Sequence, residues 1–413
     1  MGDRHTWVRA QRRPRRALFL SSPIGLGHAR RDVAIAQELR LLHPDLEIDW
    51  LAQHPVTRVL ADVGESVHPA SVHLANESAH IEDESADHDL HAFQAIRRMD
   101  EILVNNFMVF NDVVDETYYD LVIGDEAWDV DYFLHENPEL KRFAFAWLTD
   151  FVGWLPMPSG GDAEAALTAD YNAEMLEQRA RYRRLRDRSI FVGNPDDIVD
   201  ETFGPGLPRI REWTEAHYDF AGYVTGFVPP DDDGRARVRE RLACGPDEVL
   251  CVVTVGGSGV GAALLRRVMD AVPVARRMLP ALRFVVVTGP RIDPSSLPPV
   301  PGATVLGFVP DLYLALAACD VAVVQGGLTT CMELAAARRP FLYVPLENHF
   351  EQNFHVRHRL ERYGAGRCLR YADARDPAVL ADALVAEATR DVGWRTVETD
   401  GAARAAAMLA ELI

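Results

Sequence analysis

The chain has 413 residues, 48% of them hydrophobic and 25% charged, which is enough for two or three domains with buried cores. Its formal net charge of -19 argues against nucleic acid and anionic membrane surfaces as partners, because both would repel the chain at long range. The sequence contains no run of about 18 apolar residues, so no integral membrane association is expected.

An arginine-rich lead opens the chain and runs into the first predicted strand. Residues 1–14 followed by the apolar residues 17–20 mimic a secretion signal, but the apolar part is short and passes directly into a glycine-rich loop. We therefore expect a tag-like lead before the first domain.

The first predicted strand, residues 17–21, ends in that glycine-rich loop, which leads into a helix. Gly25 and Gly27 precede His28, and a helical pattern follows over residues 29–42. The positive end of the helix is expected to keep the imidazole neutral, which suits a general base. The alternative is a histidine that only caps or packs, since single histidines are usually structural.

Strands and helices then alternate, which predicts a parallel sheet with helices on both faces. Further strands are expected at residues 46–51, 119–124, 142–147 and 189–193. Asp125 follows the second of these, at the carboxyl end where open α/β sheets place functional groups. A turn aspartate is the alternative interpretation.

Residues 73–101 carry many acidic and histidine side chains. We interpret them as a solvated acidic face, and the alternative is a pocket for a cationic or aminated ligand. Asp129 and Asp131 form a DxD pattern of the kind that holds a metal, but two matching residues are a weak signal and no metal site is predicted. The prolines and aspartates of residues 226–234 predict a linker between two domains.

The second domain opens with another strand and another glycine-rich turn. Residues 249–255 are continuously apolar, and Gly256, Gly257 and Ser258 follow them before an amphipathic helix. The turn fits a loose dinucleotide fingerprint, yet the next strand, 283–288, ends in Thr-Gly-Pro instead of the acidic residue that would hold a ribose. A nicotinamide cofactor is therefore disfavoured.

The most informative stretch is residues 321–345, where an apolar strand stops at two glycines and a helix starts with two threonines and one carboxylate. These residues are Gly326, Gly327, Thr329, Thr330 and Glu333. Adjacent glycines and the N–H groups of a helix start can hold a diphosphate without lysine or metal. The carboxylate can accept two hydrogen bonds from a cis-diol, as in ribose recognition. The alternative is an ordinary buried βαβ unit with a solvated Glu333.

Residues 325–340 resemble the nucleotide-diphosphate-sugar signature of GT-B glycosyltransferases, in which His-Gly-Gly or His-Cys-Gly leads through a Ser/Thr pair and a Glu to Gly-x-Pro. Glu333 falls on the family's ribose-binding Glu. The sequence departs from the family at two positions. Gln325 stands where many members place a phosphate-contacting His, and Arg338 replaces the Gly before Pro340.

The resemblance extends to other segments and implies further donor contacts. Residues 347–366 look like the family's next element, where a polar pair, here Glu351 and Gln352, holds the sugar hydroxyls; an ordinary acidic helix start is the alternative. The glycine turn of the second domain resembles the family's diphosphate loop, and residues 307–311 resemble the turn that pairs with the base. The implied contacts are Gly256, Gly257, Ser258 and Val309.

The resemblance also implies catalytic roles in the first domain. In inverting GT-B enzymes the loop that matches Gly25 and Gly27 faces the acceptor, and a histidine at the position of His28 takes the acceptor's proton. The matching aspartate, here Asp125, hydrogen-bonds that histidine, fixes its tautomer and stabilises the imidazolium. Glu126 is the alternative partner.

The fold class implied is α/β, GT-B, with two Rossmann-like doubly wound domains that face each other across a cleft. We expect an N-terminal acceptor-binding domain at residues 15–228, a C-terminal nucleotide-sugar-binding domain at 235–390, and a last helix within 391–413 that packs back on the first domain. The oligomeric state, monomer or homodimer, stays open.

The implied activity is inverting, metal-independent transfer of a sugar from a UDP-sugar to a hydroxyl of a small molecule such as a bacterial natural product, with no covalently bound cofactor. UDP is preferred over dTDP because Glu333 favours a ribose. A UDP-sugar epimerase of the same fold and a non-catalytic GT-B-like partner protein are the alternatives.

The cysteine and lysine content bears on the compartment and on the phosphate site. All five cysteines fall in the second half without paired metal-ligand spacing, which predicts reduced core residues of a cytoplasmic protein. Lys141 is the only lysine, which excludes a Walker-type phosphate loop.

Overall fold

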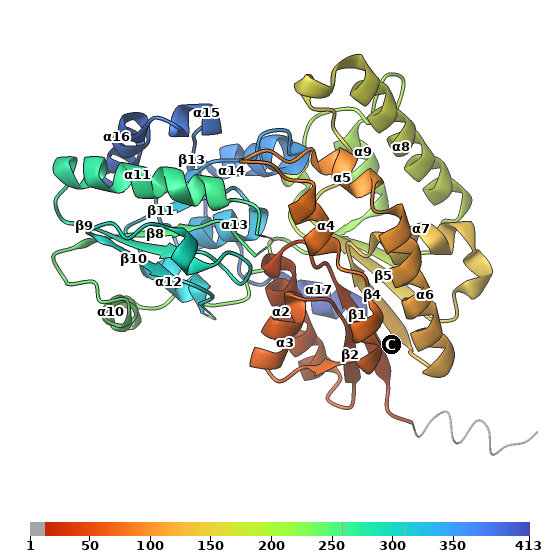
Figure 1. Cartoon of the computed structure of the whole chain (residues 1–413). Helices are drawn as coiled ribbons and strands as arrows, with labels where there is room; N and C mark the ends of the chain where they lie inside the picture. The colour runs from red at the N-terminus through yellow and green to blue at the C-terminus, as the bar shows by residue number, and fades with distance from the viewer. Residues whose placement is uncertain (1–12, 258, 310) are drawn as a thin grey trace, which may run out of the picture.

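The computed structural model describes residues 13–257, 259–309 and 311–413, and these form two lobes, each built on one parallel sheet (Figure 1). In the described residues the first sheet has the order β3-β2-β1-β4-β5-β6-β7 and the second has the order β10-β9-β8-β11-β12-β13. The doubly wound α/β architecture expected from the sequence is confirmed.

The strands are short, as is usual for a parallel sheet covered on both faces. The first sheet consists of β1 (Arg16–Ser21), β2 (Glu47–Leu51), β3 (Ser66–Val67), β4 (Leu121–Asp125), β5 (Ala144–Thr149), β6 (Arg188–Phe191) and β7 (Asp219–Phe220). The second consists of β8 (Val249–Thr254), β9 (Leu282–Val287), β10 (Ala303–Leu306), β11 (Val321–Val324), β12 (Phe341–Tyr343) and β13 (Arg367–Cys368).

Helices cover both faces of each sheet (Figure 1). The first lobe contains α2 (Leu26–Leu42), α3 (Val56–Asp62), α4 (Glu77–Asp83), α5 (Ala92–Arg97), α6 (Asp100–Glu116), α7 (Trp128–Glu136), α8 (Gly161–Arg181) and α9 (Ile210–His217). The chain then continues through α10 (Asp232–Arg241), α11 (Ala262–Met278), α12 (Leu312–Ala318), α13 (Leu328–Ala336), the π-helical segment η6 (Glu351–Val356), α14 (Arg357–Tyr363), α15 (Tyr371–Ala374), α16 (Pro377–Ala388) and α17 (Gly401–Ala410).

The strand order fixes where each lobe can hold a ligand. In the first sheet the chain moves outward from β1 through β2 to β3 and then returns to place β4 on the other side of β1. The second sheet does the same around β8 and β11. Such switch points open a crevice at the carboxyl ends of the two central strands. The loops after β1 and β4, and those after β8 and β11, are therefore the expected ligand-binding positions.

The last helix belongs to the first lobe. Helix α17 packs against α2 (Figure 1), with the buried side chains of Ala405, Ala406 and Leu409 in the same apolar core as β1 and β2. A Cβ on Gly401 would lie 2.2 Å from the carbonyl oxygen of Tyr223, so only glycine permits this close approach. The chain thus crosses between the lobes twice.

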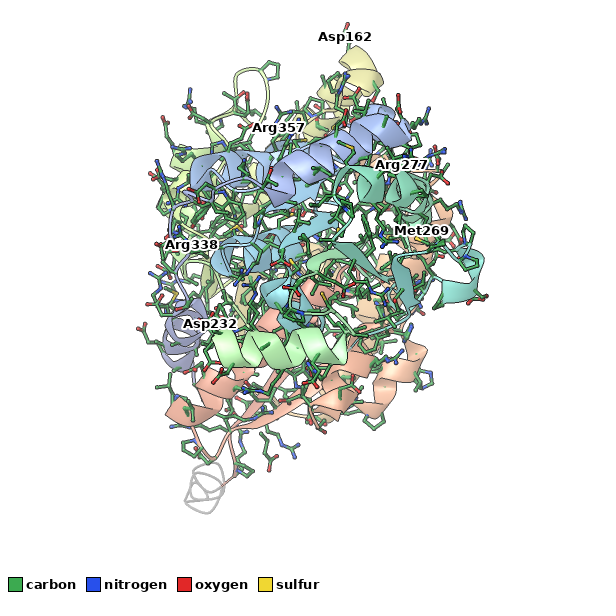
Figure 2. The ribbon with its side chains drawn as sticks, turned by 90° about the vertical axis from the view of Figure 1, so that its left-hand side faces the viewer. Asp162, Asp232, Met269, Arg277, Arg338 and Arg357 are labelled. Carbon is green, nitrogen blue, oxygen red and sulfur yellow. The ribbon has the colours of Figure 1, made fainter. Side chains whose placement is uncertain are left out.

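The first crossing is the stretch predicted as a linker at residues 226–234. The structure has irregular backbone up to residue 231, and α10 starts inside the predicted linker at Asp232. Figure 2 shows the second lobe from the side on which α10, labelled at Asp232, lies across the surface. Helix α11, labelled at Met269 and Arg277, lies above it.

Side chains of the acidic stretch 73–101 contact the second lobe, so the interpretation of this stretch as a solvated acidic face is wrong for several of its residues. Glu82 forms an ion pair with Arg291 at 2.5 Å. His88 is fully buried and its Nε2 lies 3.0 Å from the carbonyl oxygen of Val344. This segment therefore contributes contacts with the second lobe beside the cleft.

The expectations about membrane-spanning helices and about the cysteines concern features that the structure describes. Among the described helices, none combines the length and apolar character needed to cross a bilayer. Four of the five cysteines are buried, as predicted for residues of the core, and Cys368 is partly exposed.

Candidate active site

A cavity of about 180 Å³ lies between the two lobes and is lined from both sides. Its walls come from the loops that follow β1, β8 and β11, as the strand order requires. Fourteen of the predicted site residues line it: Gly25, Gly27, His28, Gly256, Gly257, Val309, Gln325, Gly326, Gly327, Thr329, Thr330, Glu333, Glu351 and Gln352. Asp125 lies behind this wall, and Ser258 falls outside the described residues.

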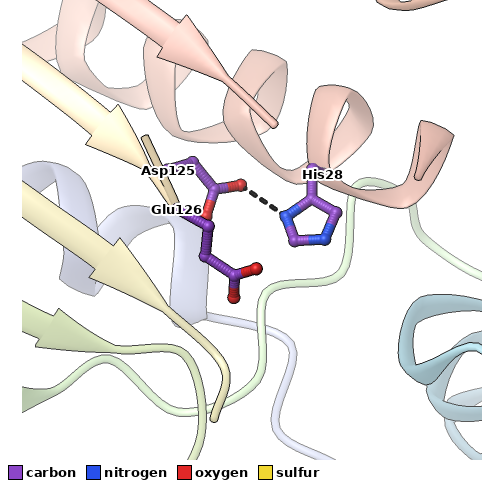
Figure 3. A group of neighbouring side chains, drawn as sticks. All are labelled: His28, Asp125 and Glu126. Atoms are coloured by element: carbon purple, nitrogen blue, oxygen red, sulfur yellow. Dashed lines mark hydrogen bonds and ion pairs between the residues drawn. The ribbon is translucent and has the colours of Figure 1, made fainter. Parts of the chain in front are cut away.

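His28 and Asp125 are hydrogen-bonded to each other. The distance from His28 Nδ1 to Asp125 Oδ2 is 2.9 Å, and the other ring nitrogen, Nε2, points away from the aspartate (Figure 3). The two residues meet because β1 and β4 are adjacent, with Ser21 opposite Asp125, while His28 stands in the first turn of the helix that follows β1. The carboxylate is fully buried and the imidazole is partly exposed.

Arg31 completes this network and was not predicted. It lies one helical turn after His28, and its Nε donates to Asp125 Oδ2 at 3.0 Å. Its two terminal nitrogens donate to the other oxygen of Asp125 and to Asp150, which follows β5. The guanidinium is almost completely buried and ties α2 to the ends of two strands.

The network also determines which nitrogen of His28 can act as a base. Arg31 Nη2 lies 2.8 Å from the same Nδ1 that contacts Asp125. In one tautomer Nδ1 carries the proton, donates it in a hydrogen bond to Asp125 and leaves Nε2 free to accept a proton. In the other tautomer Nε2 carries the proton, and Nδ1 accepts a hydrogen bond from Arg31. Only the first tautomer is a base at Nε2.

The charges around His28 make it more basic than the sequence suggested. Burial and Arg31 lower the pKa of His28, but Asp125 and Glu126 outweigh them and raise that pKa to about 9. The expectation of a neutral imidazole, based on the helix N-terminus alone, is therefore wrong for the unliganded protein. Burial would raise the pKa of Asp125, but Arg31 and His28 hold it well below its usual range.

Glu126, the alternative partner, does not hydrogen-bond His28 (Figure 3). Its Oε1 accepts from Thr149 Oγ1 at 3.0 Å and from the N–H of Asp150 at 3.3 Å. Burial and Asp150 raise the pKa of Glu126 to about 7. Its backbone φ of 51° lies in the left-handed region, an uncommon conformation for a non-glycine residue that is found often at functional sites.

His28, Asp125 and Glu126 are close enough to be considered as metal ligands, with ligand atoms within 4.8 Å of one another. The Arg31 guanidinium bonds Asp125 and has Nη2 4.0 Å from Glu126 Oε1, so the positive charge that these carboxylates need is already present. The DxD residues lie on α7, where Asp131 pairs with Arg186.

On the opposite wall the loop after β11 leads into α13. Gly326 has a φ of 110°, which favours glycine, and the first turn of α13 contains Thr329 and Thr330. Glu333 follows on the same helix and is 7% exposed. Burial raises the pKa of Glu333 to about 7 even though Arg30 lowers it.

The lobes touch through the glycines of the two loops. A Cβ on Gly27 would lie 2.1 Å from Thr329 Oγ1, and one on Gly257 would lie 2.6 Å from Leu26 Cγ. At Gly256 and Gly327 the added Cβ would meet no described atom within 4 Å. The first pair of glycines thus permits contact between the lobes, whereas the second pair leaves open space beside the cavity.

The chain is similar in sequence and in fold to known glycosyltransferases. Residues 250–391 match the model of the glycosyltransferase family 28 C-terminal domain. The spinosyn rhamnosyltransferase SpnG has a TM-score of 0.58 at 18% identity, with 96% of each chain covered. At this identity the likeness shows the fold, and the chain has the two-lobed GT-B fold.

Curated relatives match over part of their length. An uncharacterized glycosyltransferase of Methanosarcina acetivorans is 30% identical over 145 residues, which are 35% of this chain and 36% of that protein. The UDP-N-acetylglucosamine--N-acetylmuramyl-(pentapeptide) pyrophosphoryl-undecaprenol N-acetylglucosamine transferase of Carboxydothermus hydrogenoformans is 29% identical over 198 residues, 46% of this chain and 51% of that protein. Structures of SpnG include one complex with spinosyn aglycone and one with thymidine diphosphate.

Proposed function

We propose that the protein is an inverting GT-B glycosyltransferase that moves a sugar from a UDP-sugar to a hydroxyl of a small molecule. One observation carries the proposal. His28, bonded to Asp125 in the first lobe, and Glu333 on α13 in the second lobe line the same cavity from opposite sides.

In this mechanism the second lobe holds the donor. Glu333 accepts hydrogen bonds from the ribose hydroxyls, while the N–H groups and threonine hydroxyls at the start of α13 bind the diphosphate. Glu351 and Gln352 line the cavity and are assigned to the sugar hydroxyls; Gln352 Oε1 also accepts from the N–H of Leu346 at 2.9 Å, which holds its side chain in place.

The first lobe supplies the base. Nε2 of His28 takes the proton of the acceptor hydroxyl as the hydroxyl oxygen forms a bond to the anomeric carbon. The bond from that carbon to the diphosphate oxygen breaks, and the nucleoside diphosphate leaves with the electron pair. Asp125 stabilises the imidazolium, as in a Ser-His-Asp triad. Attack opposite the leaving group inverts the anomeric centre.

Apolar side chains support an acceptor with an apolar body. Ile24, Ile81 and Leu90 line the cavity on the acceptor side, and they belong to an apolar cluster that also contains Trp154 and Phe350. The SpnG complex with spinosyn aglycone is a precedent for a natural-product acceptor in this fold. An epimerase would convert a UDP-sugar without any acceptor, and a non-catalytic partner protein would not bind the donor tightly.

The donor assignment predicts selective stabilisation by uridine nucleotides. A ligand that binds only the folded state raises the melting temperature as its concentration exceeds its Kd. We expect UDP and UDP-sugars to raise it most, dTDP-sugars less, and NADH not at all, in a thermal-shift panel at equal concentrations. A panel in which no nucleoside diphosphate changes the melting temperature would contradict the proposal.

The preference for ribose is tested with UDP and 2′-deoxy-UDP, which differ only in one hydroxyl. We expect the deoxy compound to bind about 10-fold more weakly in calorimetry, because a buried hydrogen bond of Glu333 is left unmade. Glu333→Gln is the matched variant and should reduce this difference. Equal affinity of the two nucleotides in the unmodified protein would favour a dTDP-sugar donor.

The pKa of His28 predicts the pH dependence of the reaction. A general base acts in its unprotonated form, and Asp125 and Glu126 raise the pKa of His28 to about 9. We therefore expect kcat/KM to increase with pH through neutrality and to level off near pH 9. Asp125→Asn removes a carboxylate that raises the pKa of His28. The rise of kcat/KM should therefore occur at lower pH in this variant, and the maximal rate should be lower. A kcat/KM profile that is flat between pH 6 and pH 9 would contradict His28 as the base.

A further inference from the structure

Arg30 contributes the only arginine or lysine side chain among the described residues that line the cavity. It belongs to the first lobe, two residues after His28 on α2, yet it interacts with the second lobe. Its guanidinium carbon lies 5.1 Å from the centre of the Tyr313 ring on α12. Its charge also acts on Glu333 of α13. Arg30 therefore spans the cleft beside the position assigned to the ribose.

The charges of the cavity show why this residue matters for an anionic ligand. Three carboxylates line the described wall, those of Asp150, Glu333 and Glu351. Asp150 is paired with Arg31. Burial raises the pKa of Glu333 to about 7 and, together with Asp150 and Glu126, that of Glu351 to about 8, and neither carboxyl group can balance the charge of a diphosphate. Of the lining histidines, His28 has a pKa raised to about 9 but loses its charge in the form that acts as a base, and burial lowers the pKa of His349 to about 4. Arg30 supplies the permanent positive charge.

The second lobe has a buried N–H group in the wall of the same cavity that needs a hydrogen-bond acceptor. The Nε2 atom of Gln325 is buried and has no hydrogen-bond partner in the described structure, although the residue lines the cavity after β11. A buried amide without a partner costs free energy, so an acceptor atom from a ligand is the expected partner. Gln325 donates a hydrogen bond but has no charge to balance a diphosphate.

We propose that Arg30 reaches across the cleft to pair with the diphosphate of the nucleotide sugar, so that the first lobe supplies the charge and Gln325 of the second lobe supplies a neutral hydrogen bond. This inference rests on the proposed function and assigns a binding residue within it. A guanidinium matches two phosphate oxygens at once, which favours it for this task.

The position of Arg30 on α2 gives the contact a second consequence. His28 and Arg30 are fixed to the same first turns of one helix, so a diphosphate held by Arg30 places the anomeric carbon at a set position relative to His28. The ion pair forms only when the lobes are together. Donor binding and alignment of the base are thereby coupled.

The test compares UDP with uridine, which shares the base and ribose but lacks phosphate. Affinities are measured by calorimetry or NMR titration for the unmodified protein, Arg30→Gln, Arg30→Lys and Arg291→Gln. Arg291 is a suitable control because it also crosses the cleft, pairing with Glu82, but does not line the cavity.

We expect Arg30→Gln to weaken UDP binding by about 10- to 100-fold and uridine binding by no more than about twofold. Arg30→Lys should recover part of the loss, and Arg291→Gln should leave the UDP-to-uridine affinity ratio as in the unmodified protein. An unchanged ratio in Arg30→Gln would overturn the assignment of Arg30 alone. If the unmodified protein bound neither UDP nor dTDP, the proposed function itself would fail, and this inference with it.

Discussion

Replacement of His28 by alanine is expected to lower kcat by about 10²- to 10⁴-fold while leaving the affinity for UDP nearly unchanged. In the proposed mechanism the imidazole acts on the acceptor proton, whereas the nucleotide is bound by the second lobe and by Arg30. Steady-state kinetics and calorimetry on the same preparation separate the two effects.

His43→Ala is the matched control for this experiment. His43 follows the last turn of α2, the helix whose first turn carries His28, and its ring contacts Arg15 and the carbonyl oxygen of Ala410 away from the cavity. Its loss should leave kcat within about twofold, as expected for a substitution outside the site. Full activity in His28→Ala would rule out the base and leave a partner protein or a different mechanism.

Replacement of Arg31 by methionine is expected to destabilise the protein by about 3–5 kcal/mol, because it removes the guanidinium that pairs with the buried carboxylates of both Asp125 and Asp150. Urea unfolding at pH 7 measures the change. Arg142→Met is the control, since Arg142 forms an exposed ion pair with Asp115 and should cost less than about 1 kcal/mol.

The free energy of unfolding lost in Arg31→Met is expected to be smaller at lower pH. In the unmodified protein the pKa of Asp125 is depressed by Arg31 and His28, so the stability it contributes is present above the unfolded pKa and is lost as pH falls. Without Arg31, burial raises the carboxyl pKa, and protonation relieves the penalty. The deficit of Arg31→Met should therefore shrink between pH 7 and pH 5. A deficit that stays constant over this range would show that the loss comes from packing alone.

The sequence was most informative where function depends on local pattern and on strand ends. The apolar run before Asp125 predicted a strand, and the placement rule for open sheets then put the carboxylate at the cleft. The same rule would have found Asp150. The predicted strand stopped at residue 147, whereas β5 extends to Thr149, so Asp150 was not recognised as a residue at a strand's carboxyl end.

Properties that depend on contacts between distant segments could not be predicted from the sequence. The pKa of His28 is set by Asp125 and Glu126, about 100 positions away in the chain, and these outweigh the local effect of the helix terminus. Likewise the charges of residues 73–101 gave no indication that Glu82 would find its partner in the second lobe. Arg31 shows the intermediate case, because its helical spacing from His28 was visible but its carboxylate partners were not.

The return of α17 to the first lobe has a mechanical consequence. The polypeptide joins the lobes at two places, after residue 226 and again before Gly401, instead of at one. Two covalent connections leave mainly a swing about the line between them and suppress sliding and twisting of one lobe past the other. In the proposed mechanism, each closing movement would then bring the imidazole back to the same position relative to the nucleotide, which a single-step displacement requires.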